Sequence, residues 1–470
     1  MTAVHLSRTS RRAFVRTAGL IAGAGAVPAT ILAACGQSAA TSQPPSTAQQ
    51  SSAPVATTAP KVELIWWHHW AEEDSKKRVI TRFIDDYQKA KPNVTLKIQW
   101  WQKADMYPVA KNAFIAGKDF PDIMYGPENA HIEAGWFEDL SSVLDWTQFQ
   151  PGAKERATRT IAGKTGMWDP PIESGSDEIY YNPKIFDKLG IKVPDNRQYT
   201  ADEFVALAQK IRDGGFDPFA QGAGDRNYPG RFLFQYGFLA NLGCDDHKAL
   251  YSGTASWNTP GVRAVLDWGA KLAKIPAMPP TYSTMSLAES HQYFHTPPPG
   301  KDLPRAAMFL VGAWYSGRAF VPPEKGGQPA DFRVSWLKYP SFTGGKGTGL
   351  QNGGGGGGGG SVASVGKNKE IAKDVIKSFM TVKYGSLWLG ETYVPTELKT
   401  DPAQVPQGQY QWYASEYART HAGVQYCTLN VTTPPALDQA MTATLNEGLP
   451  TNAISVDKAV ELLEAGRAAK

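Results

Sequence analysis

The sequence has 470 residues, of which 42% are hydrophobic, 20% are charged and 14 are tryptophan. This is the composition of a globular protein that is long enough for two or more domains. Residues 1–34 contain four of the 48 basic residues and no acidic residue, so the remainder carries 44 basic and 44 acidic residues. A neutral body without a cluster of Lys or Arg gives no reason to expect nucleic-acid binding.

The N-terminus has the parts of an export signal in their usual order. Ser10–Arg16 contains paired arginines and resembles a twin-arginine signal, although general-secretion signals also carry such pairs. Ala18–Ala34 is a soft apolar run that is too short to span a membrane. Leu32–Cys35 resembles a bacterial lipobox, whose thiol takes the lipid before cleavage leaves Cys35 first. We therefore expect a signal peptide over 1–34 and a lipid anchor on Cys35 at the outer face of the cell membrane, the alternative being a plain signal with a chance cysteine.

Residues 35–60 are predicted to be a disordered tether. From Gly36 to Pro60 the chain contains no charge and consists mostly of Ser, Thr, Ala, Gln and Pro. Such a segment cannot bury a core, so it lets a folded body stand away from the membrane.

The folded body begins with a predicted strand, helix and strand. Val62–Trp66 alternates as a strand does, and Trp67–Trp70 is expected to be a loop. Glu72–Ala90 carries an apolar stripe at helical spacing, and Val94–Trp100 alternates again. This βαβ unit predicts parallel strands with a right-handed crossover. Ligands of open α/β sheets meet the loops at the carboxyl ends of strands, which makes Trp67–Trp70 a candidate binding loop.

Later segments also carry clear local signals. Thr200 and Glu203 form a capping box before an apolar helical stripe, and Asn258–Pro260 starts another helix with Pro in its first turn. Four tryptophans inside periodic runs are expected in the core rather than in a cleft: Trp66, Trp100, Trp257 and Trp268.

The order of several segments resembles a known family. Ala116–Ile123, Glu133–Leu140, Glu178–Phe186, Ala306–Tyr315 and Tyr393–Thr396 follow the βαβ unit in the order found in the extracellular solute-binding proteins of family 1. These proteins serve ABC importers and include relatives of maltose-binding protein. The resemblance covers roughly residues 61–470.

This resemblance implies an α/β protein with the two-lobe periplasmic-binding-protein fold, type II-like, hinged, with the ligand cleft between the lobes. The expected first lobe comprises 61–170 plus 350–395, and the second comprises 171–349 plus 396–470. Three crossings between lobes are expected near Trp168–Ser174, Thr343–Gly360 and Val394–Asp401.

Eight consecutive glycines, Gly353–Gly360, depart from the family pattern, and no strand signal survives there. Two alternatives remain open. The tract is either a flexible surface loop or a cleft wall that needs close approach of the backbone.

Other chemistry is weakly supported. Gly163–Thr165 mimics a phosphate loop without its first glycine, and the glycine tract matches a dinucleotide fingerprint only because it is all Gly. His68 and His69 are adjacent and would point to opposite faces of an extended chain, which disfavours one shared metal ion. We therefore expect no cofactor and no metal. Cys244 and Cys427 are expected to be packed thiols, with a disulfide as the alternative outside the cytoplasm.

The predicted ligand is a sugar or oligosaccharide, held by aromatic faces and by polar groups that hydrogen-bond its hydroxyls. Trp314 is the strongest candidate, because it follows a glycine where a strand ends, and Arg231 leaves room for an acidic sugar. The candidate binding residues are His68, His69, Trp70, Tyr125, Glu128, Trp168, Asp169, Asp177, Tyr228, Arg231, Trp314 and Tyr315.

The resemblance implies a function in which no bond is broken. A monomer would close its lobes on the solute and dock on the transmembrane subunits of an ABC permease. Two rivals remain: the same fold with a peptide, polyamine or metal complex as ligand, and an exported, membrane-anchored hydrolase whose carboxylate pair sequence spacing does not reveal.

Overall fold

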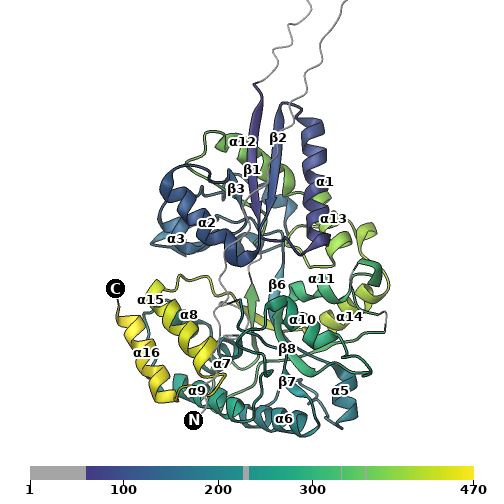
Figure 1. The fold of residues 1–470 in the computed structure, drawn as a ribbon, viewed down its shortest axis with the longest axis vertical. Coiled ribbons are helices and arrows are strands. Elements are labelled where there is room, and N and C mark those ends of the chain that lie inside the picture. The colour runs from purple at the N-terminus through teal and green to yellow at the C-terminus, as the bar shows by residue number, and fades with distance from the viewer. Residues whose placement is uncertain (1–59, 226–231, 326, 330, 355–356, 470) are drawn as a thin grey trace, which may run out of the picture. The chain divides into compact units, whose positions relative to one another are not determined.

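The computed structural model describes residues 60–225, 232–325, 327–329, 331–354 and 357–469 (Figure 1). These residues belong to one unit, which spans Thr58–Lys470. The predicted signal peptide, Cys35, nearly all of the tether, Tyr228 and Arg231 lie outside the described residues. Among the residues that are described, no helix is both long and apolar enough to cross a membrane.

A four-stranded sheet forms the base of what we call the first lobe. Its strand order is β11-β3-β1-β2, with β1 Val62–His68, β2 Val94–Trp100, β3 Ile123–Met124 and β11 Ser361–Val362. β1 and β2 are parallel from Val62↔Val94 to His68↔Trp100, which confirms the predicted βαβ unit. β1 continues through His68, so the predicted loop is shorter than expected.

Helices from both ends of the chain pack on this sheet. α1 (Asp74–Ala90) buries its predicted stripe, including Val79, Phe83 and Tyr87. α12 (Lys369–Phe379) and α13 (Val382–Thr392) come from the late part of the chain and lie near α1 (Figure 1). The first lobe is therefore assembled from two distant stretches of sequence.

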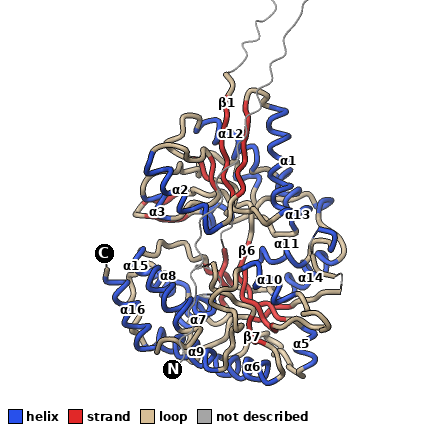
Figure 2. Tube along the Cα trace, in the orientation of Figure 1, coloured by secondary structure: helices blue, strands red, loops and turns tan. Residues whose placement is uncertain are grey.

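A six-stranded sheet forms the base of the second lobe. The order along it is β12-β10-β6-β8-β7, and β9 also pairs with β6. The strands are β6 Gly175–Tyr181, β7 Asp217–Phe219, β8 Ala306–Gly312, β9 Ser335–Leu337, β10 Leu350–Gly354 and β12 Gln425–Cys427. Figure 2 shows these strands apart from those of the first sheet. The two sheets confirm the predicted α/β class.

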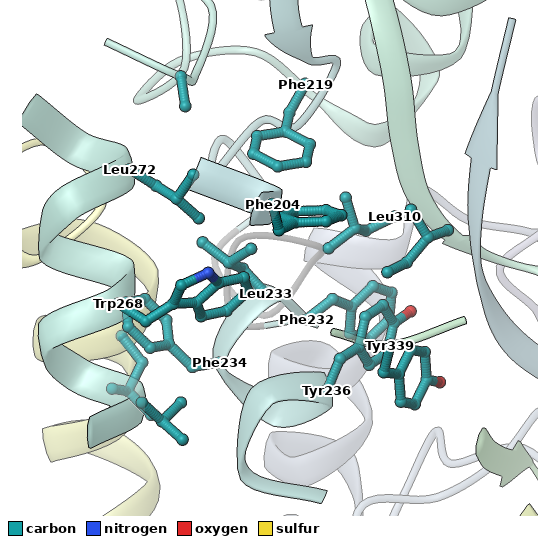
Figure 3. Packing of buried hydrophobic residues seen from close by; sticks show 14 of the residues in the cluster. Phe204, Phe219, Phe232, Leu233, Phe234, Tyr236, Trp268, Leu272, Leu310 and Tyr339 are labelled. Carbon is teal, nitrogen blue, oxygen red and sulfur yellow. The ribbon is translucent and has the colours of Figure 1, made fainter. Parts of the chain in front are cut away.

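The second lobe has the larger aromatic core. α6 (Ala201–Asp213) starts at the predicted Thr200 capping box, and α9 (Pro260–Lys274) starts after Thr259. α7 (Phe232–Leu242) is buried along almost its whole length. Figure 3 shows the rings of Tyr236 and Tyr339 side by side. They stack with centroids 4.3 Å apart. The core predictions hold for three tryptophans and partly for the fourth: Trp66, Trp257 and Trp268 are buried, whereas Trp100 is half-buried.

The remaining elements connect or cover the two sheets. The helices are α2 Lys103–Ala116, α3 Asn129–Glu133, α4 Ala153–Ala157, α5 Pro183–Lys188, α8 Cys244–Tyr251, α10 Leu287–His295, α11 Ser316–Ala319, α14 Gln409–Thr420, α15 Pro435–Met441 and α16 Val456–Ala468. A small hairpin consists of β4 Arg159–Ile161 and β5 Lys164–Gly166. Single turns are η1 Trp146–Gln148, η2 Ala313–Tyr315, η3 Pro323–Lys325 and η4 Pro402–Gln404, and η5 Thr442–Gly448 is a π-helix.

The three predicted crossings lie side by side and are bonded to one another. Gly359 N–H donates to the Pro170 carbonyl at 2.9 Å, and Ser174 N–H donates to the Pro395 carbonyl at 2.8 Å. Isolated bridges join Pro171 to Gly358 and Glu173 to Thr396. The first of these segments is thus bonded through its backbone to each of the other two.

The glycine tract contains a strand that the sequence did not indicate. Gly353 and Gly354 pair with Ser176 and Gly175 of β6, so the expectation of no strand is wrong there. Glycine has no side chain to show alternation, and the pairing partner decides the local structure. The pairing also puts β10 in the second sheet, so the sheet boundary lies after Gly354 instead of at 350.

The two body cysteines are paired, which corrects the expectation of packed thiols. Cys244, at the start of α8, forms a disulfide with Cys427, at the end of β12. The two residues are 183 positions apart in sequence, so spacing alone could not show that the fold brings them together.

Candidate binding cleft

A cavity of about 580 Å³ is lined by residues of both lobes. This size falls within the range of roughly 300–1,000 Å³ that is typical of small-molecule sites. Ring side chains reach it from each side: His69, Trp70, Tyr107 and Tyr125 from the first lobe, and His291 and Trp314 from the second.

The aromatic wall of the first lobe is packed from behind. Trp70 is 1% exposed, and its ring centroid is 3.8 Å from that of His68 and 5.1 Å from that of Trp388. His69 meets Tyr125 edge-on, with centroids 3.9 Å apart. These contacts fix the rings before any ligand arrives, so the first lobe offers a preformed surface.

Trp314 provides the aromatic surface of the second lobe. β8 ends at Gly312, and the turn η2 places the Trp314 ring against that glycine. A Cβ at Gly312 would lie 1.7 Å from the Trp314 ring, so only glycine fits there. Trp314 is half-buried, which leaves part of the ring available to a ligand.

Asp169 carries a buried acceptor in the wall of the cavity, unpaired within the described part of the chain. Its Oδ2 accepts a hydrogen bond from Gly358 N–H at 3.0 Å. Its Oδ1 is buried and has no hydrogen-bond partner among the described residues. Burial raises the pKa of Asp169 to about 6, and the hydrogen bond from Gly358 N–H and the nearby Arg159 partly offset that rise. A buried acceptor that lines a cavity is suited to accept from a ligand hydroxyl.

The glycine tract forms part of the cavity wall. Gly357 lines the cavity, and a Cβ there would lie 2.1 Å from Asp169 Oδ2. Gly358 has φ +94°, and a Cβ there would touch Tyr125 and Trp70 at 3.0 and 3.2 Å. Of the two alternatives for this tract, the described glycines support the close-approach wall.

A buried ion cluster supports the first wall, and sequence reasoning missed it. Lys76, 3% exposed, lies 2.8 Å from Glu73 and 2.5 Å from Glu173. Burial would lower the pKa of Lys76, but the two carboxylates outweigh it and raise that pKa. The ammonium also lies 4.5 Å over the Trp70 ring. The missed signal was a lysine on the apolar stripe of α1, three residues before Val79.

Further charges at the cavity are held by bonds to the crossings or the sheet. Arg156 donates to Glu397 from two nitrogens, at 3.0 and 2.5 Å, and Glu397 is 1% exposed. Asp177 Oδ2 accepts from the Asn352 side chain at 2.5 Å. The structure thus brings together six of the predicted residues: His69, Trp70, Tyr125, Asp169, Asp177 and Trp314.

Four other predicted residues do not line the cavity. His68 is fully buried behind Trp70, and burial lowers its pKa. Trp168 is 5% exposed in the core, and Tyr315 is 0% exposed with its hydroxyl 3.1 Å from His295 Nδ1. Glu128 precedes α3, and its carboxylate lies 3.9 Å from His131. Each of the four is next to a lining residue in sequence, and adjacent side chains commonly face opposite ways.

The chain belongs to the bacterial extracellular solute-binding proteins, whose family model matches residues 70–385. An ABC transporter extracellular-binding protein of Pyrococcus horikoshii is 24% identical over 259 residues, which cover 53% of this chain and 55% of the relative. The chain therefore matches about half the length of that relative.

Solved structures show the same two-lobe fold. A structure from work on xylan utilization by Caldanaerobius polysaccharolyticus matches with a TM-score of 0.69 and 20% identity, over 86% of this chain and 99% of the other. A chitin oligosaccharide binding protein matches with a TM-score of 0.70 and 20% identity, over 87% of this chain and 98% of the other.

Proposed function

We propose that this chain is the substrate-binding lipoprotein of an ABC importer, which captures a sugar or oligosaccharide and delivers it to a membrane permease. The single observation that carries the proposal is a cavity with ring side chains on both lobes around the acceptor Asp169. Aromatic faces contact the C–H faces of sugar rings, and buried acceptors select hydroxyls. The two similar structures, one from work on xylan utilization and one a chitin oligosaccharide binding protein, support the same ligand class.

The charges of the cavity favour an uncharged ligand. Six carboxylates and four Lys or Arg side chains line it. Two of those carboxylates share Lys76, and the Arg159 guanidinium lies close to the carboxylate of Asp169. A polyamine or a charged metal complex would need a stronger net charge from the wall than this arrangement offers.

Capture would proceed by bending at the three crossings. Ligand that contacts both Tyr125 and Trp314 stabilises the closed arrangement of the lobes, and the closed form docks on the permease. We further propose that the protein acts as a monomer outside the cytoplasm, anchored by lipid on Cys35. Two or more acyl chains hold a protein to a membrane stably.

Calorimetry against a panel of saccharides tests the proposal. We expect saturable binding of at least one saccharide, weakened at least about tenfold, or roughly 1.4 kcal/mol, in Trp314→Ala. Trp412→Ala is the matched control, because Trp412 is also half-buried but lies against Arg333 and does not line the cavity. If no saccharide bound, or if Trp314→Ala and Trp412→Ala lost the same affinity, the sugar proposal would be contradicted.

The hydrolase alternative makes a different prediction for the same sample. A carboxyl with a raised pKa, such as Asp169, could act as a general acid if a second carboxylate completed the pair. Prolonged incubation with each bound saccharide should return it intact in chromatography. Release of shorter saccharides, abolished in Asp169→Asn, would establish an enzyme.

A further inference from the structure

A second cavity of about 570 Å³ adjoins the binding cleft. Ala288 and Arg318 line both cavities. The second cavity is almost as large as the first, so the two together offer about twice the space of the cleft alone. The two cavities therefore adjoin at these two residues.

Helix α10 lies between the two cavities. Leu287 and His291 line only the first, whereas Gln292 and Tyr293 line only the second. Ala288, near the start of the helix, lines both. Alanine has the smallest side chain that a helix can carry without the loss of helix stability that glycine causes. Ala288 therefore obstructs the junction between the two cavities very little.

Arg318 is the other residue at the junction, and it is loosely held. Its side chain is 29% exposed, and the ion pair recorded for it joins its Nη2 to Glu73 at 3.8 Å. An ion pair this long and this exposed contributes little free energy. A ligand can therefore displace the guanidinium, or accept hydrogen bonds from it, at small cost.

The second cavity has a rigid ring and neutral donors. The Tyr293 hydroxyl hydrogen-bonds Asp217, and the Arg305 guanidinium lies 5.5 Å over the Tyr293 ring. Gln292 Oε1 accepts from the Thr296 hydroxyl at 2.8 Å, while its amide nitrogen carries two further donors. A fixed aromatic ring beside amide and hydroxyl groups repeats the chemistry of the first cavity.

We infer that the second cavity binds the far end of a linear oligosaccharide whose near end occupies the cleft, with the chain passing between Ala288 and Arg318. The inference rests on the proposed function and narrows its ligand class from sugars in general to linear oligomers. A small or compact sugar would fill the first cavity and leave the second unused.

A length series tests the inference with xylo-oligosaccharides and chito-oligosaccharides of two to six units. In the class that binds, calorimetry on the purified protein should show Kd falling at least tenfold between the disaccharide and the longer oligomers. Equal Kd values for all lengths would overturn the inference while leaving a sugar-binding function intact. If no saccharide of any kind binds, the proposed function fails as well.

Two variants locate the effect. Ala288→Trp should raise the Kd of the hexasaccharide at least tenfold, toward that of the disaccharide. Gln292→Ala, which changes only the second cavity, should weaken the hexasaccharide more than the disaccharide. Ala264→Trp on the exposed face of α9 is the matched control for an added indole. Equal weakening of both lengths in both test variants would overturn the inference.

Discussion

On the first lobe the aromatic wall of the cavity is fixed by buried partners, whereas on the second lobe two half-buried side chains, Trp314 and Arg318, line the cavity beside the buried His291 and Asp177. Trp70 is packed against His68 and supported by Lys76, which two carboxylates hold in turn. On the opposite wall Trp314 is half-buried, and Arg318 is held by a long ion pair with Glu73, whose N–O distance is 3.8 Å. One wall is prepared for the ligand, and the other has freedom to adjust.

The difference suggests a division of labour in recognition. A preformed wall loses little conformational entropy on binding, so it can contribute most of the affinity. An adjustable wall loses more entropy but can follow ligands of different length or linkage. Changes to the first wall should therefore affect stability and binding together, while changes to the second should affect binding alone.

Removing the charge of Lys76 should have the largest effect. Lys76→Met removes a buried ammonium and leaves two partly buried carboxylates, Glu73 and Glu173, without their shared cation, which we expect to lower the free energy of unfolding by about 3 kcal/mol. Urea denaturation measures the loss. Lys458→Met, which breaks an exposed pair with Glu461, should cost no more than about 1 kcal/mol. Similar values for the two variants would mean that the first wall is not held by the ion cluster.

A methyl group on the glycine wall should have the next largest effect. Gly358→Ala places a Cβ at φ +94° and against two rings, so we expect a loss of about 1–3 kcal/mol of stability, with weaker sugar binding. Gly390→Ala in helix α13 is the control: its new Cβ would lie 3.6 Å from the Gln404 carbonyl oxygen, an ordinary contact, so the free energy of unfolding should stay the same or rise slightly. If Gly358→Ala were as stable as the control, the tract would not be a rigid part of the wall.

The smallest expected effect is a pH dependence of binding. Burial raises the pKa of Asp169 to about 6, so its carboxylate is ionised above that pH and is protonated as the pH falls through it. Charged acceptors make the stronger hydrogen bonds, and we expect affinity to fall roughly threefold to tenfold between pH 7.5 and pH 5. Calorimetry at both pH values should show this fall in the parent.

Two variants assign the pH effect. Asp169→Asn should bind with nearly the same affinity at both pH values. His69→Gln should keep the fall, which separates Asp169 from the imidazole that lines the same cavity. If His69→Gln instead bound with the same affinity at both pH values, the titrating group would be the histidine.

Patterns with a strong period predicted the fold well. The stripe of α1, the alternation of β1 and β2 and the cap at Thr200 all depend on local spacing, and the structure confirms each of them. β10 could not be predicted in the same way, because its glycines carry no pattern and are ordered by pairing with β6.

The candidate site was predictable only to within a neighbouring residue. Asp169 lines the cavity while Trp168 enters the core, and Trp314 lines it while Tyr315 is buried. A sequence shows that such a pair ends a strand or begins a crossing, but the facing of each side chain depends on the tertiary fold. The support from Lys76 depends on Glu173, which is distant in sequence and reaches it only in the folded chain.

The bond between Cys244 and Cys427 gives the chain an unusual topology. The polypeptide leaves the second lobe after β10, contributes β11, α12 and α13 to the first, and returns before β12. That whole excursion lies inside a covalent ring closed within the second lobe. If β11, α12 and α13 detached from the first lobe, both ends of this segment would remain attached to the second lobe. The segment would therefore stay close to its binding position and could reattach quickly.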